Sequence, residues 1–121
     1  MAYWSFEDLE VWQRAVRLAV DVHRALRDSR EWALKDQTLR SAISVASNIA
    51  EGIERDTAAD AARFIHIAKG SAAELRTQVQ IARRIQVIDE ATARSMVDEL
   101  RRISKMLHRL AHYLRTTPER G

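Results

Sequence analysis

The sequence of 121 residues contains no cysteine, a single proline and three glycines, and only 6% of its residues are aromatic. Without cysteine the chain can form neither disulfide bonds nor thiolate metal sites, which is usual for proteins of a reducing compartment. Residues that form tight turns are scarce, whereas 46% of the residues are hydrophobic and 31% are charged. This balance is typical of amphipathic helices, and it predicts an all-α protein. The absence of cysteine makes the cytoplasm the expected compartment.

Long hydrophobic runs are missing as well. No stretch approaches the roughly 18 consecutive apolar residues that a membrane-spanning helix needs. A secretory signal would need a basic stretch and then an apolar run, and Glu7 and Asp8 stand in that region instead. We therefore expect neither membrane insertion nor export. The length fits one domain over residues 1–121 with a single core.

Apolar residues recur every three or four positions in four separate segments, as they do in helices with one buried face. The pattern predicts helices over residues 7–28, 34–55, 58–86 and 90–116. Thr57 with Asp60, and Asp89 with Thr92, are typical of helix starts, because a side-chain oxygen can accept a hydrogen bond from a free backbone N–H. Helices of similar length with short connections favour an up-down-up-down antiparallel four-helix bundle.

Charge is distributed unevenly along the chain. Residues 1–60 contain eight lysines and arginines against eleven acids, whereas residues 61–121 contain twelve against six. The second half is therefore strongly basic, although the net charge of the whole chain is only +3. Such an asymmetry indicates either a surface for a polyanion or an ordinary solvated face.

Within the basic half, cationic side chains form a stripe along the last predicted helix at spacings of three and four residues. No Asp or Glu interrupts residues 100–118. Nucleic-acid phosphates are attracted to such a stripe, and salt weakens the binding. The candidate nucleic-acid-binding residues are Arg101, Arg102, Lys105, His108, Arg109, His112 and Arg115. The same side chains could instead be solvated or contact the acidic half of another subunit.

Catalytic and metal sites are poorly supported by the residue pattern. His108 and His112 could hold a metal ion together, but a third ligand is missing and no HExxH pattern occurs. Glu51 and Glu74 could exchange protons, yet no nucleophile, histidine or oxyanion donor accompanies them. We expect no catalytic residue, no metal and no cofactor.

Small residues in the two central helices indicate close helix packing. A glycine inside a helix costs about 1 kcal/mol relative to alanine, so Gly70 needs a compensating contact. We expect Gly70, Ser71 and Ala72 to pack against the side of the preceding helix that carries small residues, namely Ser41, Ser44, Ser47 and Ala50. Packing explains these residues better than phosphate binding, because neither Gly52 nor Gly70 lies in a glycine-rich turn between a strand and a helix.

Three stretches of the chain resemble a known family. The opening matches at Phe6, Leu9 and Trp12. The central motif matches at Gln37, Arg40, Ser44, Asn48, Ile49, Ala50, Glu51 and Gly52, and the third-helix motif at Phe64, Ala68, Gly70, Ser71, Glu74 and Leu75. Over residues 6–114 the chain resembles the four-helix-bundle proteins encoded in intervening sequences of large-subunit ribosomal RNA genes. That family is related to the accessory variability determinant of diversity-generating retroelements.

The resemblance implies a ring-like homo-oligomer, with a pentamer as the expected form, and no established enzymatic activity. In the retroelement branch it also implies binding to nucleic acid and to a reverse transcriptase. Arg40, Ser44, Asn48, Glu51, Gly52, Gly70, Ser71 and Glu74 are then motif residues with a structural role.

Three functions stay open on the sequence. The first is a non-enzymatic oligomeric scaffold that binds RNA or DNA through its basic helix faces, alone or with a protein partner. The second is a protein-binding adaptor that makes no contact with nucleic acid. The third is a small enzyme, which the missing chemistry makes the weakest of the three.

Overall fold

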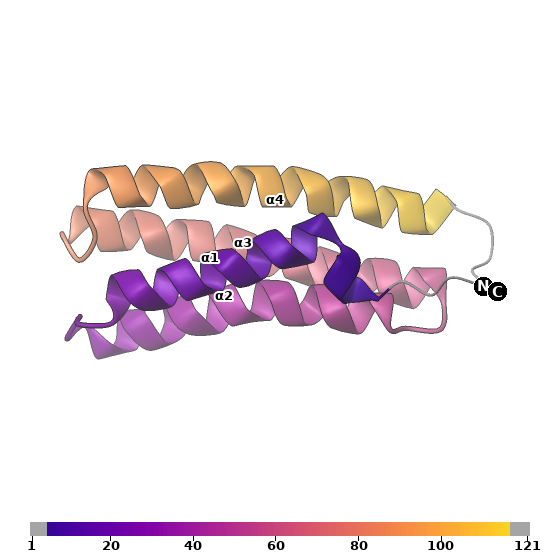
Figure 1. Ribbon diagram of the computed structural model, residues 1–121, viewed down its shortest axis with the longest axis horizontal. Helices are drawn as coiled ribbons and strands as arrows, with labels where there is room; N and C mark the ends of the chain where they lie inside the picture. Colours follow the sequence, from indigo (N-terminus) through magenta and orange to yellow (C-terminus); the bar gives the residue numbers. More distant parts are fainter. Residues whose placement is uncertain (1–4, 117–121) are drawn as a thin grey trace.

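A computed structural model describes residues 5–116, and that part of the chain contains four α-helices, one short 3₁₀ helix and no strand. The elements are η1 (Phe6–Asp8), α1 (Glu10–Leu26), α2 (Trp32–Ile53), α3 (Ala58–Arg84) and α4 (Glu90–Thr116). Figure 1 shows the four α-helices side by side along the long axis of the molecule. The α1–α2 and α3–α4 connections lie at one end, and the α2–α3 connection lies at the other. The all-α prediction is confirmed; residues 1–4 and 117–121 lie outside the described part.

The first helix differs from its prediction at its start. α1 begins at Glu10 rather than at residue 7, because Ser5 caps a separate 3₁₀ turn. The Ser5 hydroxyl accepts a hydrogen bond from the Glu7 backbone N–H at 3.1 Å, and Asp8 accepts one from the Ser5 N–H at 3.0 Å. Leu9 then adopts an extended conformation, so the α-helix has to begin after it.

The second and third helices also differ slightly from the predicted ranges. α2 lies two residues earlier than expected at both ends, and α3 ends at Arg84 instead of residue 86. Gln86 has a φ of 64°, a left-handed conformation that helices commonly use to stop. The Val87 N–H then donates to the Ala82 carbonyl at 2.8 Å, which satisfies a carbonyl of the last helical turn.

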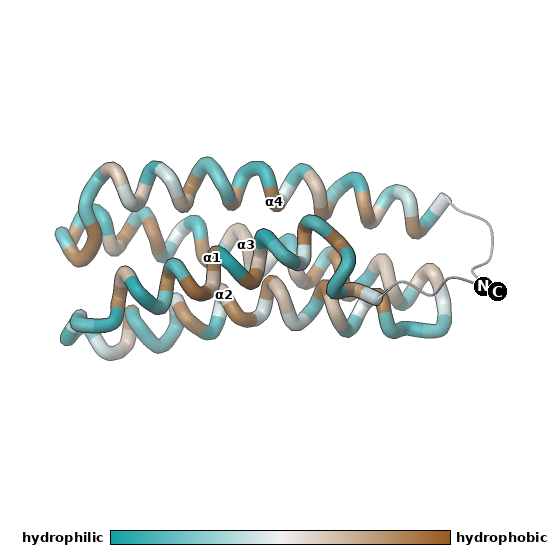
Figure 2. Tube along the Cα trace, in the orientation of Figure 1, coloured by the Kyte–Doolittle hydropathy of each residue, from teal (hydrophilic) through white to brown (hydrophobic). Residues whose placement is uncertain are grey.

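One apolar core runs between the helices. The side chains of Ile49, Ile65, Leu100, Ile103 and Leu107 have no exposed surface. Apolar and polar residues alternate along every helix in Figure 2, as expected when one face is buried. α3 packs extensively on both α2 and α4, whereas α1 packs mainly on α2. Within residues 5–116 every helix is too polar or too short to cross a lipid bilayer.

The two internal glycines have opposite environments. A Cβ atom at Gly52 would lie 3.0 Å from the carbonyl oxygen of Ala61 and 3.1 Å from the Cβ of Phe64. At Gly70, which is exposed, no heavy atom lies within 4 Å of that position. The prediction that Gly70 packs closely against the preceding helix is therefore wrong. Each helical residue turns the chain by about 100°, so Ser71 faces α2 and Gly70 faces outward.

Ser44 and Ser71 make the contact that was expected from the small residues. Their hydroxyl oxygens lie 2.8 Å apart and share a hydrogen bond between α2 and α3. The Asn48 amide donates to both the carbonyl and the hydroxyl oxygen of Ser44 at 2.9 Å, which holds that hydroxyl in place. Ser41 is buried, whereas Ser47 is exposed, so only part of the small-residue face meets α3.

Side-chain caps hold the starts of α3 and α4 at the predicted residues. The Thr57 hydroxyl accepts from the Asp60 backbone N–H at 3.1 Å. The Asp89 carboxylate accepts from the Thr92 N–H at 2.7 Å, and this hydrogen bond lowers the pKa of Asp89 below its usual value. Both caps satisfy backbone donors that the helix itself cannot pair.

The glycines give a matched test of packing. We expect Gly52→Leu to lower the free energy of unfolding by about 1–3 kcal/mol, because the added side chain meets backbone atoms that cannot move aside. Gly70→Leu should instead leave stability unchanged or raise it by up to about 1 kcal/mol, since it removes a helical glycine without creating a clash. Urea denaturation of both variants at one protein concentration measures the difference. Equal losses of unfolding free energy in the two variants would contradict a packed position at Gly52 and an open one at Gly70.

The Asp89 cap predicts a specific pH dependence. Because the pKa of Asp89 is lowered on folding, its stabilisation is present above the unfolded-state pKa of about 4 and is lost as the pH falls through the lower folded-state value. Asp89→Asn keeps an oxygen acceptor that does not titrate. We expect wild type to lose more stability than Asp89→Asn between pH 6 and pH 3 in denaturant titrations. If wild type and Asp89→Asn lose the same stability between these pH values, the charge of Asp89 does not stabilise the start of α4.

Candidate nucleic-acid interface

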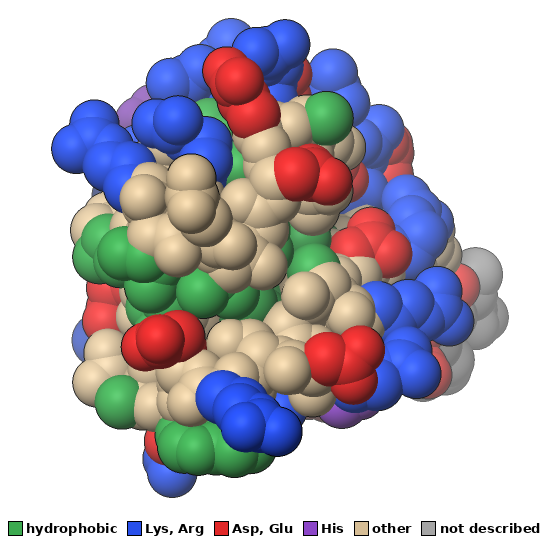
Figure 3. Space-filling model, turned by 90° about the vertical axis from the view of Figure 1, so that its left-hand side faces the viewer, with side chains coloured by type: hydrophobic (Ala, Val, Ile, Leu, Met, Phe, Trp, Pro, Cys, Tyr) green, Lys and Arg blue, Asp and Glu red, His purple; other side chains and the backbone are tan. Residues whose placement is uncertain are grey.

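Five of the seven candidate residues form one continuous strip on α4. Arg101, Lys105, His108, His112 and Arg115 follow spacings of four and three residues, and all five are exposed. We refer to these residues as the α4 stripe. Figure 3, which faces the end with the α1–α2 and α3–α4 connections, shows lysine and arginine side chains along the upper edge, where α4 lies in Figure 1. Leu100, Ile103 and Leu107 bury the opposite side of α4 and thereby turn the stripe to the surface.

A second row of basic side chains comes from α3 and contacts the stripe directly. Lys69 Nζ lies 3.3 Å from His108 Nδ1. Arg115 NH1 lies 2.7 Å from His66 Nε2. Arg76 follows Lys69 by seven residues, so it lies on the same side of α3. We refer to His66, Lys69 and Arg76 as the α3 row, and to the row and the α4 stripe together as the α3–α4 basic face.

The α3 row was missed by the sequence reasoning, although a signal for it exists. His66, Lys69 and Arg76 are spaced by three and seven residues, which is a helical repeat. The repeat is inconspicuous because acids and apolar residues surround it in the sequence. It adds to the basic stripe only because α3 packs beside α4, which the sequence does not show. The structure supplies that pairing through the two contacts between histidines and cations.

Acidic side chains lie beside the end of this face where α4 begins. Glu90 and Asp98 line a small groove near Arg83 and Arg101, at the end where α4 begins. Glu90 pairs with Arg94 at 3.1 Å there. Beyond residue 99, α4 carries no acid, so the positive charge of the stripe grows toward Arg115.

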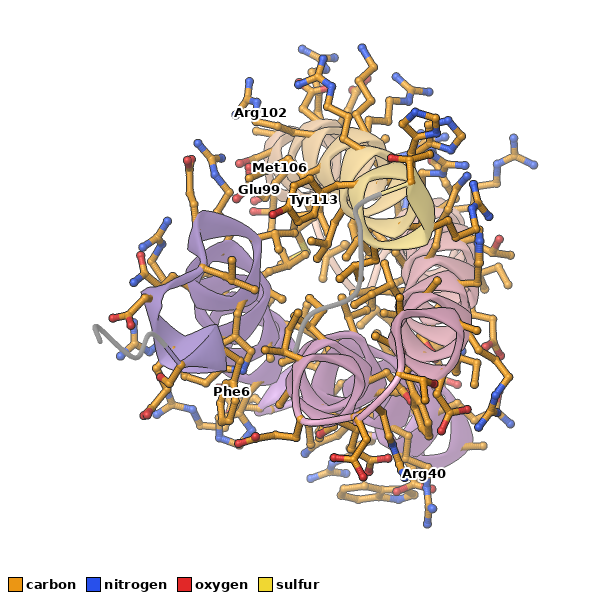
Figure 4. The ribbon with its side chains drawn as sticks, turned by 90° about the vertical axis from the view of Figure 1, so that its right-hand side faces the viewer. Phe6, Arg40, Glu99, Arg102, Met106 and Tyr113 are labelled. Atoms are coloured by element: carbon orange, nitrogen blue, oxygen red, sulfur yellow. The ribbon has the colours of Figure 1, made fainter. Side chains whose placement is uncertain are left out.

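Arg102 lies apart from the α4 stripe, on the side of α4 that faces α1. Its guanidinium lies 3.4 Å from the Glu99 carboxylate, which also pairs with Arg14 of α1 at 2.8 Å. Arg14 pairs in turn with Glu10 at 2.8 Å, and these carboxylates raise the pKa of the Arg14 guanidinium. Figure 4 shows Glu99 and Arg102 together on this side, with Met106 and Tyr113. Arg102 therefore belongs to an ion-pair network, while Arg109, seven residues later on the same side of α4, is exposed.

The groove between α1 and α4 carries charges of both signs. Its volume is about 740 Å³, and Arg17, Arg24 and Arg94 line it together with Asp21 and Asp98. Alternating charges attract a polyanion far less than a face of one sign does. This groove is accordingly a weaker candidate for phosphate binding than the α3–α4 basic face.

The motif residues occupy the α2–α3 side of the molecule. Arg40 is exposed and pairs with Asp36 at 2.9 Å, and Figure 4 shows it pointing away from the helices. Glu51 pairs at 3.5 Å with Arg55, which lies just beyond the end of α2, and Glu74 is exposed. No group of three His, Asp or Glu side chains among residues 5–116 is arranged to hold a metal ion. The motif residues thus make helix contacts and surface ion pairs.

Comparison with known proteins supplies a family. The family model described as 23S rRNA-intervening sequence protein matches residues 7–109. The fold is similar to the crystal structure of a protein with unknown function from the S23 ribosomal protein family of Bacteroides thetaiotaomicron. That similarity has a TM-score of 0.79 and 24% sequence identity, and it covers 84% of this chain and 97% of the other. No curated protein matches the chain. Because the family model spans most of the sequence, the protein belongs to the 23S rRNA-intervening sequence protein family.

Proposed function

We propose that this protein is a non-enzymatic oligomeric scaffold that binds the phosphate backbone of RNA or DNA through the α3–α4 basic face. The observation that carries the proposal is the pairing of two rows of cationic side chains, with no acid on α4 beyond residue 99. Neutralised phosphates release counterions, which favours association at low salt.

The composition of the face favours binding without sequence preference. Its members are Arg, Lys and His side chains, which suit phosphate oxygens, and all of them are exposed except the half-buried Lys69 and Arg76. No aromatic residue belongs to the face, so stacking of bases is not expected to contribute. We therefore expect contacts that fix the position of a strand without reading its bases.

We further propose that an up-down-up-down antiparallel four-helix bundle assembles into a ring-like homo-oligomer, with a pentamer as the expected form. The alternating ends of the helix connections support the topology. Exposed apolar side chains support self-association, among them Val20 at 42%, Ile43 at 57% and Ile67 at 42% exposure. Ile67 lies next to the open Gly70, where another backbone could approach closely. A ring would repeat the basic face, so weak sites would combine on one long strand.

A protein-binding adaptor is the second candidate, and one groove favours it. Between α1 and α2 a groove of about 440 Å³ is lined mainly by apolar side chains, including Val16, Val20, Leu39 and Ile43. An apolar groove of this kind suits a helix of a partner, such as a reverse transcriptase or another cytoplasmic protein. The adaptor and the scaffold differ in whether nucleic acid binds at all.

Removal of the charge tests nucleic-acid binding. For four phosphate contacts the affinity of wild type for long RNA or DNA should fall roughly 50- to 150-fold between 50 and 200 mM salt. We expect the fourfold variant Arg101→Gln, Lys105→Gln, Arg109→Gln and Arg115→Gln to bind far more weakly and with a flatter salt dependence. Fluorescence anisotropy with a 60-nucleotide strand measures both quantities.

A matched control removes the same charge elsewhere. Arg17, Arg24, Arg27 and Arg30 are exposed on α1 and the connection that follows it. Changing these four to Gln lowers the net charge equally, and we expect nearly unchanged binding. A wild type that shows no salt-sensitive binding to either long RNA or long DNA would leave the adaptor as the better proposal.

Oligomerisation has its own measurement. We expect light scattering at micromolar concentration to give a mass several times the 13.9 kDa of one chain, with five chains as the expected number. Ile43→Lys should shift the mass toward a single chain, because a charge would have to be buried in an apolar contact. A wild-type mass of one chain would refute the ring.

A further inference from the structure

Two histidines of the α3–α4 basic face have cations as hydrogen-bond partners. His66 of α3 faces Arg115 of α4 through Nε2, at 2.7 Å. His108 of α4 faces Lys69 of α3 through Nδ1, at 3.3 Å. Ammonium and guanidinium groups only donate hydrogen bonds, so each of these ring nitrogens must accept with its lone pair. Both imidazoles are therefore neutral in this arrangement, with the proton on Nδ1 of His66 and on Nε2 of His108.

Protonation of either ring would end its contact. The proton would occupy the lone pair that now accepts from the cation, and two positive groups would then face each other at hydrogen-bond distance. Protonation would also add charge to a face that is already basic. An anion placed between the two groups would favour the protonated ring, because it would pair with both positive charges.

The charged groups around these rings are almost all cations. On α3, His66 has Arg63 and Lys69 within one turn, and on α4, His112 lies beside Arg115. Asp60 is the nearest acid of α3, and it pairs with Arg63 at 3.3 Å.

His108 has Lys105, Arg109 and His112 as its neighbours on α4, and Lys69 faces it from α3. From α2, which packs on the other side of α3, Glu51 is already paired with Arg55. The α1 side of α4 presents Glu99, which is bound to Arg14 and Arg102. Among residues 5–116, no acid forms a hydrogen bond or ion pair with either histidine, so none compensates for its protonation.

We propose that His66, Lys69, His108 and Arg115 form a phosphate-binding site that takes up protons from solvent when a nucleic-acid backbone binds. At each of the two pairs, a phosphate oxygen accepts from the cation and from the newly protonated ring, and the imidazole changes from an acceptor for a protein cation into a donor to the ligand. The site rests on the proposed function and adds a condition to it, because binding then strengthens as the pH falls through the range in which histidine titrates.

Binding at two pH values tests the site. The probe is a fluorescein-labelled 60-nucleotide oligouridylate at constant ionic strength. We expect about tenfold tighter binding at pH 6.0 than at pH 8.0, since each proton taken up changes the dissociation constant by up to about tenfold per pH unit. Inorganic phosphate as a competitor distinguishes the sources of the anion: a backbone site should need far more free phosphate than oligouridylate for equal occupancy.

Two variants separate this effect from general basicity. His66→Gln with His108→Gln keeps acceptors for Arg115 and Lys69, but neither glutamine can gain a proton. This variant should therefore lose most of the pH dependence of wild type and keep only the part that His112 contributes. His23→Gln, on α1, is the matched control and should keep the full pH dependence of wild type. Circular dichroism checks that both variants retain their helical content.

Nuclear magnetic resonance of ¹⁵N-labelled histidine gives an independent readout. We expect the two opposite tautomers in the free protein at pH 8 and protonation of both rings when oligouridylate is added at pH 6.5. Salt-sensitive binding with the same affinity at both pH values would overturn the proton-linked site and leave the proposed function standing. If no binding occurs at pH 6.0 or at pH 8.0, both the proton-linked site and the proposed function are overturned.

Discussion

Burial of the apolar side of α4 against α3 is the interaction on which the rest of the structure depends. Leu100, Ile103 and Leu107 are fully buried, and their positions determine which residues of α4 can reach solvent. The same packing sets the register between the two helices, which places Lys69 against His108 and His66 against Arg115. The core and the basic face thus lie on opposite sides of the same pair of helices. A shift of α3 along α4 would separate the α3 row from the α4 stripe.

Much of the fold could be predicted because helical periodicity is a local property. Four long segments with one apolar side each, and the caps at Thr57 and Asp89, are readable from neighbouring residues. The start of α1 could not be read in this way, because Ser5 and Asp8 form a local turn that competes with the helix. The end of α3 depends on the left-handed Gln86, a conformation that glycine more often adopts.

The candidate site could be predicted only along one helix. Spacing identifies the α4 stripe, but it cannot show that α3 adds His66 and Lys69 or that Arg14 of α1 pairs with Glu99. The same restriction applies to Gly70, which was expected to pack against α2 and is exposed instead. Its neighbour Ser71 makes the contact with α2, and a rotation by one residue decides between a packed and an open position. Contacts between helices depend on how each helix is rotated about its axis relative to its neighbour. The sequence of one helix alone does not determine that rotation.

The unequal packing of α1 has a consequence for how the fold comes apart. α1 rests mainly on α2, and a wide groove lies between it and α4, crossed by the ion pair of Arg14 and Glu99. The larger internal contacts join α2, α3 and α4. Local opening should therefore start with α1 as a unit, at lower free energy than global unfolding. The helix pair that carries the basic face then belongs to the most persistent part of the molecule, and its charge arrangement outlasts the loss of α1.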